Sequence, residues 1–289
     1  MRAVSEDGAT SRRLQEVVGS RPYVDGPTAI LIGLMAVGFP TAGVLSHRSV
    51  LPAWAALLVG SALMNLSFTA WHEPAHQTFS RSRALNTAAG WLAAFLSLYP
   101  GYFARRREHL VHHKFEGQEG KDPVFPRIQA TFWSFPVTLS RAVLARAPLD
   151  VPTSFLPISR AQRVADALSN LLALSIVVGA SALGYFWAVF WVWALPRLVI
   201  YGVHAYYICY FPHCVPGGGY AVLRIREDHP WLRLLTVNQH LHGIHHRWPW
   251  IPWHRYRRVL RDCADELRRE NILEPAAGTA VLAGRSGSE

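Results

Sequence analysis

The sequence predicts an all-α integral membrane protein with four transmembrane helices, a cytoplasmic cap that carries clustered histidines, and interfacial helices. Three observations indicate this fold. Hydrophobic residues make up 51% of the 289 positions and gather in long uncharged runs. Basic residues, which give a formal net charge of +10, lie mainly between those runs. Finally, most of the 14 histidines fall into one HxxxH and two HxxHH motifs.

The first half of the chain contains a polar tail and two uncharged runs. Residues 1–27 are expected to form an N-terminal tail, because the first apolar run starts too late and is too long for a typical cleaved signal peptide. Thr28–Leu45 and Ser49–Trp71 carry no charge. At about 1.5 Å per helical residue, runs of this length cross a bilayer core. A membrane domain is therefore predicted over residues 28–273, followed by a flexible tail at 274–289.

The segment Leu85–Phe103 is moderately apolar, yet it separates two histidine motifs that must share one side of the membrane to form one site. We therefore expect it to lie in the interface or to dip into the membrane and return. Pro100 and Gly101 favour a break there. The segment Gln129–Arg146 mixes aromatic and aliphatic residues with arginines, which predicts an amphipathic helix on the membrane surface.

The second half of the membrane domain contains the long apolar stretch Ala167–Phe211. To return the third histidine motif to the same side, this stretch must cross the membrane an even number of times, and its length suffices for two helices. The aromatic segment Tyr185–Trp193 predicts the turn between them, by analogy with interfacial belts. Pro196 would then lie in a first helical turn, and Arg197 would reach toward the far surface.

Basic residues precede the first run and follow the second and the fourth, which by the positive-inside rule places both termini and the histidine motifs in the cytoplasm. This placement explains the basic excess through contact with anionic lipid headgroups, without nucleic-acid binding. The three cysteines have no paired spacing and predict no disulfide framework.

The histidine motifs predict a metal centre. Residues at i, i+3 and i+4 share one helix face, so each motif presents its imidazoles together. Eight imidazoles are too many for one ion and suit two, and an all-nitrogen set favours iron in a redox role. The predicted ligands are His72, His76, His109, His112, His113, His242, His245 and His246. Isolated histidines such as His47 and His229 are not expected to be ligands.

Acidic residues near the motifs offer further ligands or partners that orient the imidazoles. The candidates are Glu73, Glu108, Glu116 and Asp122. Pro74, between the first two histidines, is expected to bend its helix.

These motifs, in this order and with four spans, resemble the membrane fatty acid desaturase and hydroxylase superfamily. The similarity covers about residues 71–126 and 208–256. It includes Gly120–Pro123 after the second motif, and Asn238, Pro249 and Trp253 around the third. The stretch from Phe211 through the glycines to Tyr220 is similar to carotenoid ketolases and holds a further histidine, His213.

The resemblance implies a centre of two iron ions that uses O2 to attack an unactivated C–H bond of a lipid. Electrons would come from an external donor of the ferredoxin or cytochrome b5 type with its reductase. It further implies that the eight motif histidines are ligands, that His213 is a ninth, and that Asn238 orients a water or a ligand. His240 has no role in this pattern.

Several functions remain open at this point. Acyl-chain desaturation is preferred, and hydroxylation or ketolation of a carotenoid is the alternative within the superfamily. Residues 72–76 also match HExxH, the zinc-protease motif, but Pro74 disrupts the required helix and two complete HxxHH motifs would stay unexplained. A metal transporter would need ligands along its spans, where His204 is the main polar residue.

Overall fold

A computed structural model describes residues 8–125, 155–210, 213, 225, 228–270 and 272–273. The described part is mostly helical and contains no strand, only isolated bridges between Val24 and Ser80 and between Ile225 and Leu273. The expected interfacial helix at Gln129–Arg146 and the tail at 274–289 lie outside the described residues.

Four helical stretches are long and apolar enough to cross a membrane. The first is α2 (Gly26–His47), and the second joins α3 (Ala53–Asn65) to α4 (Ser67–Ala75). The third is α9 (Arg160–Ala182). The fourth runs from Phe186 to Ile208 through α10 (Phe186–Val189), η1 (Phe190–Ala194), α11 (Leu195–His204) and the start of η2 (Ala205–Tyr210). The predicted number of spans is therefore confirmed.

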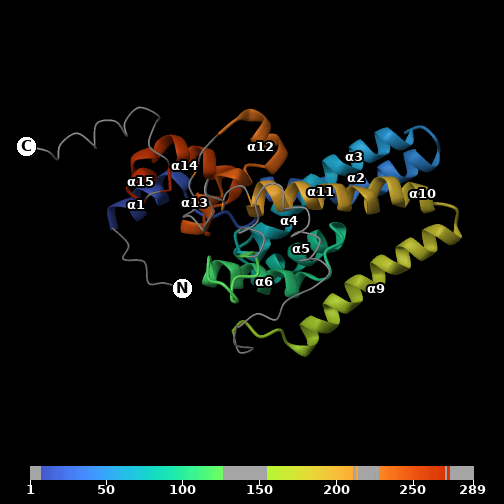
Figure 1. Cartoon of the computed structure of the whole chain (residues 1–289), viewed down its shortest axis with the longest axis horizontal. Coiled ribbons are helices and arrows are strands. Elements are labelled where there is room, and N and C mark those ends of the chain that lie inside the picture. Colours follow the sequence, from blue (N-terminus) through green and yellow to red (C-terminus); the bar gives the residue numbers. More distant parts are fainter. Residues whose placement is uncertain are drawn as a thin grey trace, which may run out of the picture.

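The spans pack unevenly. α2, α3 and α11 lie side by side, whereas α9 diverges from them and meets α10 at one end and α5 and α6 at the other (Figure 1). Only 11% of the apolar window of α9 is buried, against 39% for the second span. Gly60 of α3 allows the closest approach, because a Cβ there would lie 2.3 Å from the carbonyl oxygen of Val192 in η1.

The segment between the first two histidine motifs does not cross the membrane as one helix. α5 (Arg83–Leu96) is 14 residues long, and the chain breaks before α6 (Tyr102–Phe115). Gly101 has a φ of 131°, and its missing side chain lets Asp166 of α9 approach. Asp166 accepts hydrogen bonds from the backbone N–H groups of Phe103 and Ala104, which caps the start of α6.

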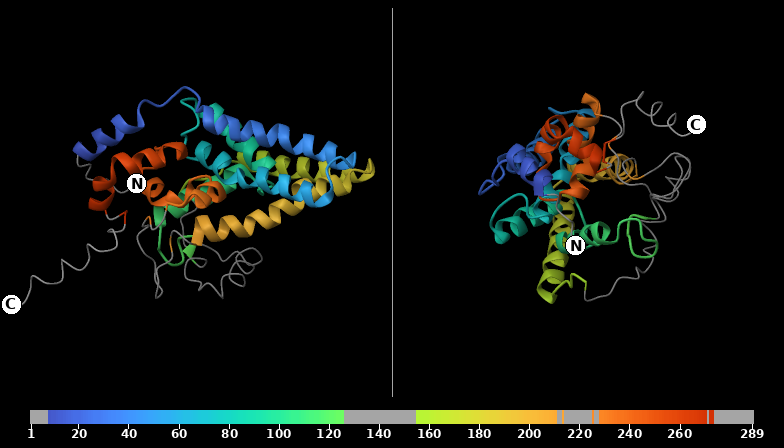
Figure 2. Two further views of the ribbon diagram at one scale, coloured as in Figure 1. Left: turned by 90° about the horizontal axis from the view of Figure 1, so that it is seen from above. Right: turned by 90° about the vertical axis from the view of Figure 1, so that its left-hand side faces the viewer.

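A cap of short helices extends beyond the spans (Figure 2). It contains α1 (Gly8–Val18), α12 (Pro230–Thr236), η3 (Gln239–Leu241), α13 (His242–Arg247), η4 (Trp253–Arg255), α14 (Tyr256–Asp262) and α15 (Ala264–Arg269). Part of the predicted tail is thus helical: α1 buries Leu14 and Val18 in one apolar cluster with Tyr256, Val259 and Leu267.

Hydrogen bonds between the start of α2 and η4 join the first span to the cap. Asp25, buried at the start of α2, accepts a hydrogen bond from the Thr28 backbone and lies 2.8 Å from Nε2 of His254. Burial alone would raise the pKa of Asp25, but the contacts with His254 and Thr28 outweigh it and lower the pKa. The indole of Trp253 donates to the Thr28 hydroxyl at 3.1 Å.

Two details of the second half were predicted wrongly. The turn between the third and fourth spans lies at residues 183–185, with Gly184 at a φ of 79°, and most of the aromatic segment continues into the fourth span. Pro196 does lie in the first turn of α11, as predicted, but α11 continues the fourth span instead of beginning it. Arg197 does not reach the far surface; it stacks on Tyr99 and Tyr201.

Candidate metal centre

The motif histidines lie on or next to three helices, α4, α6 and α13, and their side chains meet in one region. The second span continues to Ala75, so His72 lies in the last turn of α4 and His76 caps its end. Pro74 lies in the same turn, and the helix ends there because the chain turns back through hydrogen bonds to the carbonyls of Glu73 and Pro74. α6 presents the second motif on successive turns, and the short α13 presents the third.

Five imidazoles form the first cluster, which contains His72, His76, His109, His113 and His245. Their Nε2 atoms approach closely: His72 to His245 at 3.1 Å, His76 to His109 at 2.7 Å. His113 lies 3.1 Å from His109 and 2.9 Å from His245. Metal–imidazole bonds of about 2.1 Å at right angles would separate two nitrogens by about 3 Å. The spacing therefore fits neighbouring ligands of one ion.

Three imidazoles form the second cluster, which contains His112, His213 and His246. His242 lies beside it, with its ring centroid 4.6 Å from that of His246 and 5.9 Å from that of His213. The two clusters touch where the rings of His113 and His246 stack at 4.1 Å.

The clusters do not correspond to the sequence motifs. On α6, His109 and His113 belong to the first cluster, and His112 belongs to the second. α13 divides its histidines likewise, with His245 in the first cluster and His246 in the second. Each HxxHH motif therefore contributes to both clusters, as adjacent helix positions point about 100° apart.

Carboxylates contact the outer nitrogens of several imidazoles. Asp122 lies 2.8 Å from Nδ1 of His112 and also accepts the backbone N–H groups of Gly117 and Val124. Glu116 lies 3.1 Å from Nδ1 of His246 and 3.8 Å from Nδ1 of His213. These contacts leave Nε2 directed inward, the usual arrangement around a bound metal.

The other two acidic candidates behave differently from each other. Glu73 lies 3.4 Å from Nδ1 of His72, and it accepts a hydrogen bond from the Thr78 hydroxyl at 2.6 Å. It therefore supports an imidazole in the same way as Asp122. Glu108 instead forms an ion pair with Arg105 at 3.1 Å.

The electrostatics favour neutral imidazoles. Burial lowers the pKa of His245 well below its ordinary value, and the neighbouring imidazoles lower it further. Burial likewise lowers the pKa of His242 to about 3. Neutral imidazole is the form that binds metals. Nδ1 of His242 and Nε2 of His246 are buried and find no hydrogen-bond partner among the described residues, as expected of nitrogens that would hold an ion. The donor set therefore fits two metal ions.

The remaining histidines lie elsewhere. His240 is enclosed by Asp228, 3.2 Å from Nε2, and Thr236, 2.9 Å from Nδ1. With both nitrogens engaged, it acts as a structural link within the cap. His204 lies 3.2 Å from the Asn65 side chain, and His47 stacks on Tyr185 at the turn.

Among the described residues, no side-chain hydrogen bond of Asn238 bears on its predicted role. Its backbone adopts the left-handed conformation (φ 63°) just before η3, which asparagine tolerates better than most residues. Sequence reasoning missed its neighbour Gln239, whose buried amide donates to Thr69 of α4 at 3.2 Å. Gln239 thereby joins the third motif to the helix of the first. No spacing rule points to it, because the contact is 170 residues apart in the chain.

A cavity adjoins both clusters. The cavity is small, about 20 Å³, and is lined by the imidazoles of His109, His112, His213 and His242, by the apolar side chains of Phe68, Val124 and Ile208, and by Arg105 and Glu108. Imidazoles of both clusters and apolar side chains therefore meet at one place.

Comparison with known proteins identifies the family of the chain and several relatives. The profile of the family described as fatty acid desaturase matches residues 48–274. Two fungal proteins named Delta(12) fatty acid desaturase, from Mortierella isabellina and Mortierella alpina, are each 44% identical over 54 residues, 19% of this chain. The zeaxanthin 4-ketolase of Chlamydomonas reinhardtii is 29% identical over 197 residues, 64% of this chain. The matches span 13% of each fungal protein and 39% of the algal protein.

Proposed function

The chain belongs to the fatty acid desaturase family, and from this we propose that it is a membrane oxidoreductase that uses two iron ions and O2 to desaturate a lipid acyl chain. The observation that carries the proposal is the pair of touching imidazole clusters at the end of the spans. We propose as ligands the eight motif histidines together with His213. Iron bound there would activate O2 and remove hydrogen from an unactivated C–H bond.

The protein itself supplies position and environment for this chemistry. Asp122, Glu116 and Glu73 hold imidazoles in the orientation that directs Nε2 inward. Phe68 stacks on His72 at 5.0 Å and, with Ile208, excludes water from the side nearest the membrane. An acyl chain entering from the bilayer would meet these apolar side chains before it reached the clusters. We propose that Asn238, whose left-handed backbone precedes η3, orients a water or a ligand near the third motif.

The alternative reaction is oxidation of a carotenoid ring. The similarity to a protein named zeaxanthin 4-ketolase extends over more of this chain than the similarity to the desaturases and specifically favours this second candidate. Both reactions begin with removal of hydrogen from a C–H bond of an apolar substrate, so the same centre suits either.

Expression in two hosts separates these reactions. One host should produce only acyl lipids and the other should also produce carotenoids, and both lipid fractions are analysed by mass spectrometry. New double bonds in acyl chains are the expected result. A new keto-carotenoid with unchanged acyl chains would replace desaturation by ketolation. Purified protein with stoichiometric zinc and turnover without O2 would contradict the entire proposal.

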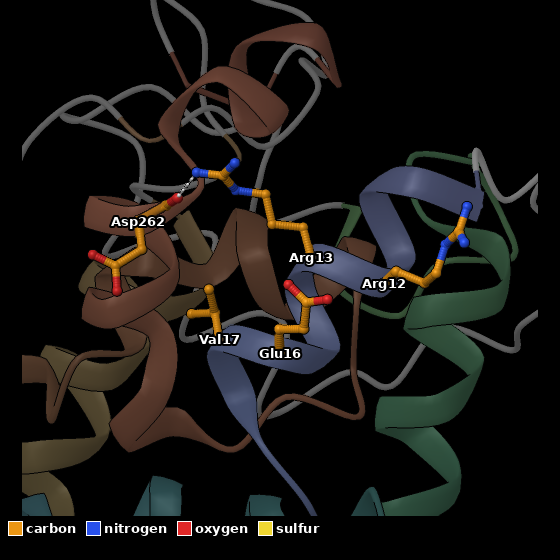
Figure 3. A pocket seen from close by; sticks show the side chains of 5 residues that line it. All are labelled: Arg12, Arg13, Glu16, Val17 and Asp262. Carbon is orange, nitrogen blue, oxygen red and sulfur yellow. Dashed lines mark hydrogen bonds between the residues drawn. The ribbon is translucent and has the colours of Figure 1, made fainter.

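We propose that electrons arrive at the cap from a soluble acidic donor of the ferredoxin or cytochrome b5 type. The helices α1, α14 and α15 carry seven arginines and four acidic residues. Arg13 of α1 crosses to the Asp262 carbonyl of α14 and leaves an open hollow between the helices (Figure 3). This surface lies at the end of the molecule opposite the turn between α9 and α10 (Figure 1).

We further propose that this cap is cytoplasmic. The basic residues that flank the spans support this orientation through the positive-inside rule.

A further inference from the structure

The fourth span carries a charge that no described residue neutralises. Arg197 lies in the middle of the stretch from Phe186 to Ile208, where a guanidinium is costly and is usually paired or functional. Within the described ranges it has no ion pair, and its buried Nη1 atom has no hydrogen-bond partner. Its neighbours Leu198 and Val199 are exposed toward lipid, whereas Arg197 itself is half-buried and turned toward the protein.

A second donor without an acceptor lies next to the same aromatic ring. The guanidinium carbon of Arg197 is 4.4 Å from the ring centre of Tyr99, and Trp71 meets Tyr99 edge-on at 5.6 Å. Trp71 is fully buried, and its Nε1 also has no hydrogen-bond partner among the described residues. Buried donors are rarely left unsatisfied, because each costs about 1–3 kcal/mol. Both donors contact the Tyr99 ring and are available to an acceptor on a bound molecule.

This pair of donors lies close to the metal centre. The Trp71 ring is 5.5 Å from that of His109 and 5.9 Å from that of His72. Arg105, which lines the cavity beside the clusters, stacks on Trp71 at 5.1 Å and on Tyr99 at 5.4 Å. Trp71 and Tyr99 therefore form a continuous series of ring contacts from the imidazoles to Arg197.

We propose that Arg197 and Trp71 form a subsite for a hydrogen-bond-accepting oxygen of the otherwise apolar substrate. This inference rests on the proposed lipid oxidoreductase function and extends it to the substrate class: the lipid carries an oxygen that anchors it while a C–H bond lies at the clusters. A carboxylate would also neutralise the guanidinium. A ring hydroxyl would satisfy the donors without neutralising the charge.

Binding of defined lipids to the iron-loaded protein in nanodiscs, measured without O2, tests the subsite independently of turnover. The first arm compares oleate with 9-octadecene, and the second compares zeaxanthin with β-carotene. The wild type should bind the oxygenated member of at least one pair about tenfold more tightly. Preference in the first arm identifies an acyl carboxylate as the ligand, and preference in the second identifies a hydroxyl. Equal affinities within both pairs would overturn the proposal, whether or not any variant folds.

The variant Arg197→Met removes the donors while retaining side-chain length and should abolish the preference. Arg197→Lys, which retains the charge, should keep part of it. The matched control is Arg48→Met, in the exposed loop between α2 and α3. If Arg197→Met weakened the oxygenated and hydrocarbon ligands equally, the arginine would have only a packing role and the subsite would be rejected. Iron content and O2-dependent turnover of the wild type, measured separately, test the proposed function itself.

Discussion

At the residue scale, the division of each HxxHH motif between two clusters makes the histidines interdependent. His245 approaches both His72 and His113 through Nε2, so it joins the first and second motifs. If the imidazoles share an ion as proposed, loss of one of them would weaken the hold of its neighbours on that ion. We expect His245→Ala to lower bound iron and to reduce activity by more than about a hundredfold, beyond the effect typical of an orienting partner. Metal analysis and turnover assays measure both.

The controls for that variant are His47→Ala and His229→Ala, which remove histidines at the α9–α10 turn and before α12. Both should retain full iron content. Full iron and normal turnover in His245→Ala would rule out a centre shared between the motifs.

His213 gives a sharper test of the second cluster. Its ring is buried, 5.1 Å from that of His112 and 5.3 Å from that of His246. As a ligand, it should resemble the motif histidines when replaced, so His213→Ala should lose about one of the two iron ions. Replacement of a histidine that lies only at the membrane interface would have little effect on bound iron. Unchanged iron content in His213→Ala would therefore show that His213 is not a ligand.

Asp122 is expected to act through His112. Its carboxylate is nearly inaccessible and contacts Nδ1 of His112. Asp122→Asn retains the shape but replaces one oxygen by an amide nitrogen, so it should weaken metal binding about 10–100-fold. The control is Asp265→Asn, whose side chain is 86% exposed on α15. Equal metal affinity in both variants would show that the contact with His112 is not needed to hold metal.

The motif histidines could be predicted from sequence because helical spacing fixes which residues share a face. Their division into clusters could not, because it depends on how α4, α6 and α13 meet in space. For the same reason Asp122 was only one of four acidic candidates. Gln239 was missed because its contact with Thr69 joins distant parts of the chain.

At the element scale, the close packing of the second and fourth spans depends on Gly60. An added Cβ would meet the Val192 carbonyl and the Pro196 ring at 2.7 Å or less, and neither can move freely. We expect Gly60→Ala to destabilise the protein by about 1–3 kcal/mol, the usual cost of overpacking. Thermal unfolding in detergent, followed by circular dichroism, measures the change.

Gly33 of α2 provides the matched control, because a Cβ there meets nothing within 4 Å and faces the lipid side. Gly33→Ala should be neutral or stabilising by up to about 1 kcal/mol through helix propensity. A Gly60→Ala protein as stable as Gly33→Ala would mean that η1 adjusts without cost.

The spans themselves were predictable because bilayer thickness demands long apolar runs, and sharing one site demands an even number of crossings. The position of the turn was not. Aromatic residues suggested an interfacial belt at Tyr185–Trp193, but the helical stretch runs on through η1 and α11, with Pro196 in the first turn of α11. Composition alone does not distinguish an aromatic belt from an aromatic part of a span, and Arg197 consequently lies in the middle of the fourth span instead of at its edge.

At the scale of the whole molecule, the proposed donor surface is separated from the lipid-facing spans. Acidic partners associate with basic surfaces through screened electrostatics, so electron transfer should slow as ionic strength rises. We expect Arg258→Glu with Arg261→Glu to reduce donor-supported turnover about tenfold while iron content stays unchanged. Turnover supported by a small chemical reductant should not change. An equal loss with both reductants would indicate damage to the centre itself.

The proposed orientation of the whole molecule rests on charge placement and would determine which compartment supplies the electrons. Leu183, 75% exposed, lies at the turn between α9 and α10, and Asp265 lies on the cap at the opposite end. In a background without native cysteines, Leu183→Cys should react with an impermeant maleimide on intact cells. Asp265→Cys should react only after permeabilisation, because the positive-inside rule retains the arginine-rich flanks in the cytoplasm. The reverse labelling pattern would place the cap outside and exclude cytoplasmic electron donors.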